Sequence, residues 1–110
     1  MIVALVPLSP SEVDARLQAG QAVLIDIREP DEFAGEHIPG AAPAPLSGLA
    51  STDLPVTPGR EVIFMCRSGG RTNANCDPLA ARVPGQAFVL DGGLDGWKRA
   101  GLATSNSNGK

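Results

Sequence analysis

The chain has 110 residues and a formal net charge of −3 at pH 7, and hydrophobic residues make up 43% of it. This length and apolar share predict one globular domain. No stretch approaches the roughly 20 apolar residues of a membrane span, residues 2–6 are too short a run for a secretory signal, and no basic run indicates a nucleic-acid partner. We therefore expect a cytoplasmic protein that binds neither membranes nor nucleic acid.

The first part of the chain carries signals for a helix, a strand and a second helix. Residues 9–12 read Ser-Pro-Ser-Glu, which combines a capping serine, a proline in the first turn and a capping-box glutamate. They predict a helix over residues 10–19 that stops at Gly20. The apolar run 22–27 predicts a strand covered on both faces, and a short helix is expected at residues 30–34.

The remaining elements alternate in the same way. Residues 39–59 contain five of the ten prolines, so this stretch is expected to be mainly loop, with one helical turn near residues 46–50. Strands are predicted over residues 61–65 and 87–90, the first followed by a helix, and a short helix over residues 94–99. This order predicts a three-layer α/β domain with a central, largely parallel sheet flanked by helices.

The most informative segment is residues 66–71, Cys-Arg-Ser-Gly-Gly-Arg, directly after an apolar strand. Gly69 and Gly70 can adopt positive φ, so that backbone N–H groups turn toward one point, and a helix beginning near Arg71 adds its positive end. Both features favour a thiolate, which is the reactive form of cysteine. We predict that Cys66 is a nucleophile in an anion cradle, open to solvent at the carboxyl end of its strand.

Pro78 should interrupt the helix that follows this loop. A proline there removes the backbone hydrogen bond to the Ala74 carbonyl. We expect a break or bend at residues 75–78, with Asp77 as the cap of a second segment and Pro78 as its first residue.

The two cysteines are predicted to be free thiols. There is no Cys-x-x-Cys pattern, and one histidine with two cysteines supplies too few ligands for a structural zinc site. No metal or cofactor is therefore expected. Cys76 lies five residues into the expected helix, roughly 7 Å along its axis. That separation disfavours a disulfide with Cys66, and we interpret Cys76 as a core residue.

Four segments together resemble the rhodanese family. Residues 24–29 resemble its first core strand. Residues 33–41 resemble its N-terminal signature, which is an aromatic residue, three further residues and then His-Ile-Pro-Gly-Ala. Residues 66–71 are similar to its active-site loop, and residues 92–97 to its closing Gly-Gly…Gly-Trp turn.

The resemblance extends over about residues 5 to 103 and implies the rhodanese α/β fold. We expect a single rhodanese-like domain over residues 1–103, followed by a polar, flexible tail at residues 104–110.

The resemblance also implies a sulfurtransferase. Cys66 would take a sulfane sulfur from a small donor such as thiosulfate, become a persulfide, and pass the sulfur to cyanide or to a thiol, including a thiol on a protein. Arg67 and Arg71 would neutralise the sulfonate end of the donor, while Ser68 either donates its hydroxyl to the persulfide or only favours the turn. The residues predicted to bind substrate are Arg67, Ser68, Gly69, Gly70 and Arg71.

Two alternatives stay open at this point. One is a sulfur-carrier or protein-interaction module without its own turnover. The other is a phosphatase or arsenate-reductase-like enzyme of the same fold, but those enzymes have five residues between cysteine and arginine. Only four residues lie between Cys66 and Arg71, which favours a cradle for one sulfur atom.

Four further residues are given structural roles. His37 belongs to the turn motif, and Asp26 and Arg28 follow the first buried strand, where they are expected to pair or to brace the cysteine loop. Trp97 is expected to seal the core behind the paired glycines.

Overall fold

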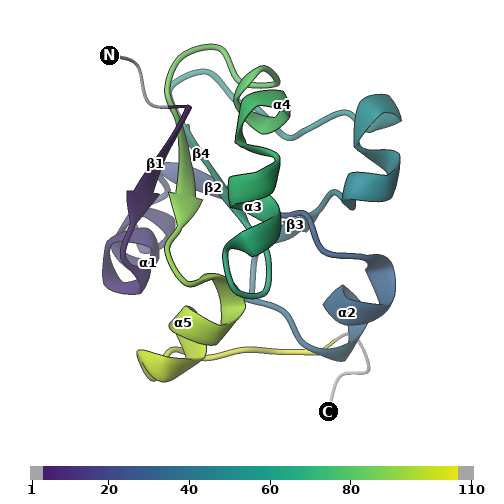
Figure 1. The fold of residues 1–110 in the computed structure, drawn as a ribbon. Coiled ribbons are helices and arrows are strands. Elements are labelled where there is room, and N and C mark those ends of the chain that lie inside the picture. Colours follow the sequence, from purple (N-terminus) through teal and green to yellow (C-terminus); the bar gives the residue numbers. More distant parts are fainter. Residues whose placement is uncertain (1–3, 107–110) are drawn as a thin grey trace.

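The computed structural model describes residues 4–106, which form one sheet with helices on both sides (Figure 1). The strands are β1 (Leu5–Leu8), β2 (Ala22–Asp26), β3 (Ala42–Pro43), β4 (Glu61–Met65) and β5 (Ala87–Leu90). The helices are α1 (Pro10–Gln18), α2 (Pro30–Gly35), α3 (Gly70–Ala74), α4 (Cys76–Ala80) and α5 (Gly93–Arg99), and η1 (Leu46–Ser51) is a 3-10 helix.

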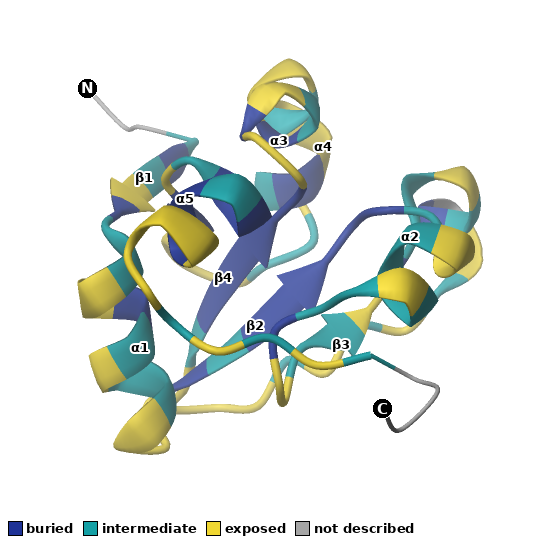
Figure 2. Ribbon diagram, turned by 90° about the horizontal axis from the view of Figure 1, so that it is seen from below, coloured by how far each residue is buried: buried dark blue, intermediate teal, exposed yellow. Residues whose placement is uncertain are grey.

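The strands pair in the order β1-β5-β4-β2-β3, and every pairing is parallel. Strand β4 lies in the middle, with Leu24 of β2 opposite Ile63. Figure 2 shows β2 and β4 as buried strands between helices that are partly exposed. The predicted α/β fold with a parallel central sheet is confirmed.

Side chains alternate along β4 and build a separate apolar layer on each face of the sheet. Val62 and Phe64 belong to one cluster with Leu79 of α4, while Ile63 belongs to the other with Trp97 of α5. This alternation follows from the pleat of a strand. It explains why the strand reads as a continuous apolar run, and it confirms that Trp97 is a core residue.

Both edge strands of the sheet were absent from the elements predicted from the sequence. β1 contains Pro7 and β3 ends at Pro43, and both residues argue against a strand when the sequence is considered alone. A proline is compatible with an edge strand because only one side of that strand has to pair. The helical turn predicted near residues 46–50 is present as η1.

The helix after the cysteine loop is broken, as predicted, but the break is centred on Asn75. This residue ends α3 and caps α4, with φ −120° and ψ 22°. The expected cap at Asp77 is therefore wrong, and Pro78 is the third residue of α4. Pro78 has no N–H to donate to the carbonyl of Ala74, four residues earlier. A continuous helix would lose this hydrogen bond, which favours a break before Pro78.

Part of the predicted flexible tail is held by the domain. Ser105 forms an antiparallel bridge with His37, with two backbone hydrogen bonds of 2.8 Å. The Thr104 hydroxyl donates to Glu36 at 2.8 Å. Thr104 and Ser105 of the expected tail thus contact the domain, and residues 107–110 of that tail lie outside the described part of the chain. Within residues 4–106, no helix is long and apolar enough to cross a membrane.

Candidate active site

The cysteine loop connects β4 to α3 at the carboxyl edge of the sheet. The carbonyl of Cys66 accepts a hydrogen bond from the N–H of Leu94, and the carbonyl of Arg67 accepts one from the N–H of Asp95, both at 2.9 Å. The first turn of α5 therefore fixes the backbone of Cys66 and Arg67 through their carbonyl groups. The N–H groups of the residues that follow in the loop can then turn toward the thiol.

Gly93 makes this close approach possible. It has φ 59°, and a Cβ added there would lie 2.4 Å from the Cys66 carbonyl oxygen and 2.7 Å from the Arg67 carbonyl carbon. Any side chain at this position would collide with the backbone of the loop. The Gly-Gly turn of the sequence is thus a packing requirement of the site.

Gly69 directs a backbone donor at the sulfur. Its φ is 101°, and its N–H donates to the Sγ atom of Cys66 at 3.1 Å. Gly70 does not share this conformation: it begins α3 with ordinary φ, and a Cβ there would lie 3.9 Å from the Ser68 hydroxyl. Of the two glycines that could adopt positive φ, only Gly69 does so.

Thr72 is a site residue that the sequence analysis missed. It is fully buried, its hydroxyl donates to the Gly69 carbonyl at 2.9 Å, and the hydroxyl oxygen lies 3.8 Å from the Cys66 sulfur. The hydroxyl thus restrains Gly69 from its carbonyl side, next to the amide that donates to the thiol. A threonine three residues after a glycine, in the first turn of a helix, is the sequence signal that could have indicated it.

The surroundings of Cys66 lower the pKa of its thiol. Burial alone would raise the pKa, but hydrogen bonds from the backbone amides of Thr72, Gly69 and Arg71, together with the neighbouring Thr72 hydroxyl, outweigh it. Helix α3 has only five residues, so these individual donors, rather than a long helix dipole, stabilise the thiolate.

The thiol is less accessible than the sequence suggested. Cys66 keeps only 1% of its surface exposed, whereas its neighbours Arg67 and Ser68 are exposed. The expectation of an open sulfur is therefore wrong for this conformation.

The two loop arginines differ in how they are held. Arg71 donates two hydrogen bonds to Glu32 of α2, at 2.7 Å and 2.9 Å. Arg67 has a side chain that is 70% exposed, and its Nε lies 3.8 Å from an Asp95 oxygen. The two guanidinium groups flank the loop as predicted, but each has a carboxylate beside it.

A buried ion pair braces the neighbouring helix α2. The Arg28 guanidinium bonds the Asp26 carboxylate, with a shortest distance of 2.8 Å, and also donates to the Glu36 carbonyl at 2.6 Å. The pairing expected for these two residues is confirmed, with α2 rather than the cysteine loop as the element that Arg28 holds. His37 stacks on Phe33 and bonds its carbonyl, consistent with a structural role.

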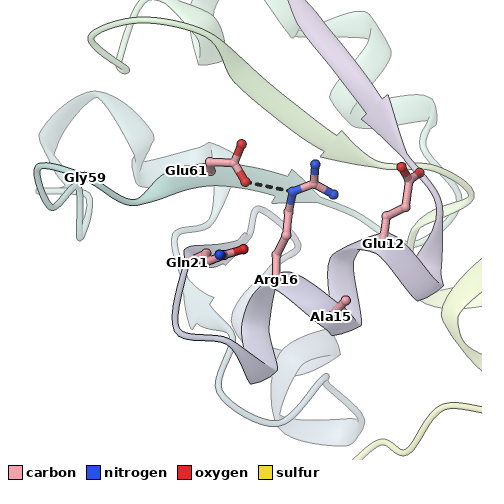
Figure 3. A pocket seen from close by; sticks show the side chains of 6 residues that line it. All are labelled: Glu12, Ala15, Arg16, Gln21, Gly59 and Glu61. Carbon is pink, nitrogen blue, oxygen red and sulfur yellow. Dashed lines mark hydrogen bonds and ion pairs between the residues drawn. The ribbon is translucent and has the colours of Figure 1, made fainter.

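Two cavities lie at opposite ends of the sheet. One of about 260 Å³ adjoins the cysteine loop and is lined by charged residues, namely Arg28, Asp31, Glu32, Glu36, Arg67, Asp95 and Lys98, together with Gly35 and Leu94. The other, of about 590 Å³, lies at the beginning of β4, where Arg16 pairs with Glu61 (Figure 3). It is roughly 16 Å along the strand from Cys66, too far to take part in chemistry at the thiol.

Both cysteines are free thiols, and Cys76 packs against the cluster that contains Leu79. Among residues 4–106 no group of three or more histidine, cysteine or acidic side chains is arranged to hold a metal ion.

The sequence profile of the rhodanese-like domain matches residues 9–100. The chain belongs to this family. The predicted resemblance is thereby confirmed, and it places the loop of Cys66 inside a rhodanese-like domain.

Known proteins of similar sequence and structure agree with this assignment. An uncharacterized protein of Synechocystis is 36% identical over 90% of this chain, and a sulfurtransferase of Allochromatium vinosum is 35% identical over 73% of this chain and 75% of its own length. The crystal structure of a thiosulfate sulfurtransferase from Pseudomonas aeruginosa has a TM-score of 0.74 and 28% identity, covering 96% of this chain and 21% of the other.

The chain spans 55% of the length of the Synechocystis relative and 42% of a transcriptional regulator of Mycobacterium tuberculosis that it also matches. Rhodanese-like domains thus occur as parts of longer proteins of different kinds. The homologues named sulfurtransferases indicate transferase activity for this family.

Proposed function

We propose that this rhodanese-like domain is a sulfurtransferase that moves a sulfane sulfur through a persulfide on Cys66. The observation that carries the proposal is the hydrogen bond from the Gly69 N–H to the Cys66 sulfur at 3.1 Å. An amide aimed at a buried thiol favours its anion, and the same amide suits the anionic sulfur of a persulfide.

The reaction has two displacement steps. In the first, the Cys66 thiolate attacks the outer sulfur of thiosulfate, a sulfur–sulfur bond forms, and sulfite leaves with the electron pair of the broken bond. In the second, cyanide or a thiolate attacks the outer sulfur of the persulfide and leaves as thiocyanate or as a new persulfide. The Cys66 thiolate is restored, and neither step needs a general base because both nucleophiles are already ionised.

The loop residues have distinct parts in this proposal. Gly69 supplies the amide, and Gly70 begins the helix behind it. Arg67, Ser68 and Arg71 line the approach to the sulfur and contact the sulfur donor. Because Cys66 is only 1% exposed, the side chains of this loop move when the sulfur donor arrives. A cytoplasmic location, where thiol acceptors are available, belongs to the same proposal and agrees with the free state of both cysteines.

Intact mass measurement after incubation with thiosulfate tests the proposal. We expect the mass to increase by one sulfur atom and to return to its original value on adding cyanide. The Cys66→Ser variant should show no increase, while the matched Cys76→Ser variant should behave as the original protein.

The outcome also separates the alternatives. A sulfur adduct that forms on Cys76 instead would contradict the assignment of Cys66. An adduct that forms only from a persulfidated protein, and never from thiosulfate, would favour a sulfur carrier over an enzyme that uses a small sulfur donor.

A further inference from the structure

The ion pair between Arg71 and Glu32 places a carboxylate beside the cysteine loop. Both Arg71 nitrogens at its tip are used by Glu32, and the two side chains are only 37% and 29% exposed. Arg71 also interacts electrostatically with the Cys66 thiolate, so this guanidinium lies within the field of the reacting sulfur. Because Glu32 balances its charge, this guanidinium attracts a second anion less strongly than a free arginine would.

Glu32 is held in place from its own helix. Its carboxylate accepts the N–H of Glu29 at 3.1 Å in the capping box that begins α2, and its carbonyl lies 3.5 Å from the Arg28 guanidinium. The hydrogen bonds from Arg71, opposed by partial burial, lower the pKa of Glu32 to about 2. Glu32 is therefore ionised at any pH at which the thiolate reacts.

The cavity beside the loop adds to the negative charge. Its wall carries four acidic residues, namely Asp31, Glu32, Glu36 and Asp95, against three cations, namely Arg28, Arg67 and Lys98. Each of those three cations has a carboxylate partner, at 2.8 Å, 3.8 Å and 2.9 Å respectively. A dianion such as thiosulfate thus meets more negative than positive charge along this wall.

We propose that Glu32 determines the choice of sulfur donor by neutralising Arg71, so that the site disfavours dianionic thiosulfate and accepts low-charge persulfides. This inference rests on the proposed function and specifies its substrate class. With a persulfide R–S–SH, the Cys66 thiolate attacks the outer sulfur, R–S⁻ leaves, and Cys66 carries –S–SH. No sulfonate has to be neutralised in that reaction, so Arg71 can stay bound to Glu32.

The Glu32→Gln variant tests the inference because glutamine keeps the size of the side chain and the oxygen that accepts from Glu29. We expect the KM for thiosulfate to fall roughly tenfold, since the Arg71 guanidinium loses its carboxylate partner and one of its two hydrogen bonds and can bind the sulfonate with charge-assisted hydrogen bonds. The rate of Cys66 persulfide formation from cysteine persulfide, followed by intact mass, should change by less than about twofold because that reaction needs no free cation.

Two controls make the test specific. Asp31→Asn removes the same charge from the same cavity wall without releasing Arg71, and it should leave the thiosulfate KM within roughly twofold of the original. In an Arg71→Met background, Glu32→Gln should bring no gain, since the gain requires the released guanidinium.

The inference is overturned if both proteins form the persulfide and their thiosulfate KM values are equal, or if the gain persists without Arg71. If neither thiosulfate nor cysteine persulfide puts sulfur on Cys66 in the original protein, the proposed function itself is contradicted. A gain for thiosulfate alone cannot result from general damage to the fold, because damage would lower both reactions.

Discussion

The two ends of strand β4 differ in how tightly the backbone around them is packed. At the amino end, Arg16 and Glu61 border a cavity of about 590 Å³, and a Cβ added to the nearby Gly59 would meet nothing within 4 Å. At the carboxyl end, a Cβ on Gly93 would lie 2.4 Å from the Cys66 carbonyl oxygen. The polar side chains of the larger cavity pair with one another or with their own helix, whereas the crowded end directs backbone amides at one sulfur atom.

In our account, the pKa of Cys66 depends on the packing of the surrounding backbone rather than on the size of a cavity. An amide stabilises an anion best when it is already oriented before the anion forms. The close contact between α5 and the loop, and the bond from Thr72 to the Gly69 carbonyl, both provide that orientation.

The largest expected effect is that of Gly93→Ala. The methyl group collides with the backbone of Cys66 and Arg67, so the free energy of unfolding should fall by about 3 kcal/mol or more. The matched variant Gly59→Ala also places alanine at positive φ, 85°, but in open space, and should cost only about 1 kcal/mol. Urea unfolding of both variants measures the loss in free energy of unfolding. Equal losses would contradict the proposed difference in packing between the two ends of β4.

A smaller effect is expected from Thr72→Val, which removes the hydroxyl and keeps the shape. The pKa of Cys66 should rise, because the hydroxyl near the sulfur and its hydrogen bond to the Gly69 carbonyl are both lost. The rate of persulfide formation on Cys66 at pH 7 should therefore fall roughly fivefold. Thr52→Val is the control, since the Thr52 hydroxyl donates to the Gly48 carbonyl at 2.7 Å in η1, away from the thiol. If both variants react at the original rate, Thr72 does not position the loop.

The sequence predicted those features that depend on neighbouring residues. Three features follow from patterns within a few residues: the capping box of α1, the buried strand β4 and the break at Asn75. The position of Cys66 at the end of a strand belongs to the same group. In these cases, local propensity and the final packing agree, so the sequence alone was sufficient.

Other features could not be predicted because they join distant parts of the chain. Arg71 and Glu32 are 39 residues apart, and only the packing of α2 beside the loop brings them together. The contact of Gly93 with Cys66 and the low exposure of the thiol likewise depend on where α5 lies. The edge strands were missed because a short segment containing proline becomes a strand only when a neighbour pairs with it.

Titration of the Cys66 thiol shows whether the amides of the loop stabilise its anion. In the Cys76→Ser variant, the ultraviolet absorbance of the thiolate is followed against pH, first for the folded protein and then in urea. Because the bonded amides favour the thiolate, we predict that the folded protein ionises at a lower pH than the unfolded chain, and that alkylation by a small reagent reaches its plateau at that lower pH. A folded thiol that titrates at the same pH as the unfolded one, or above it, would contradict the account.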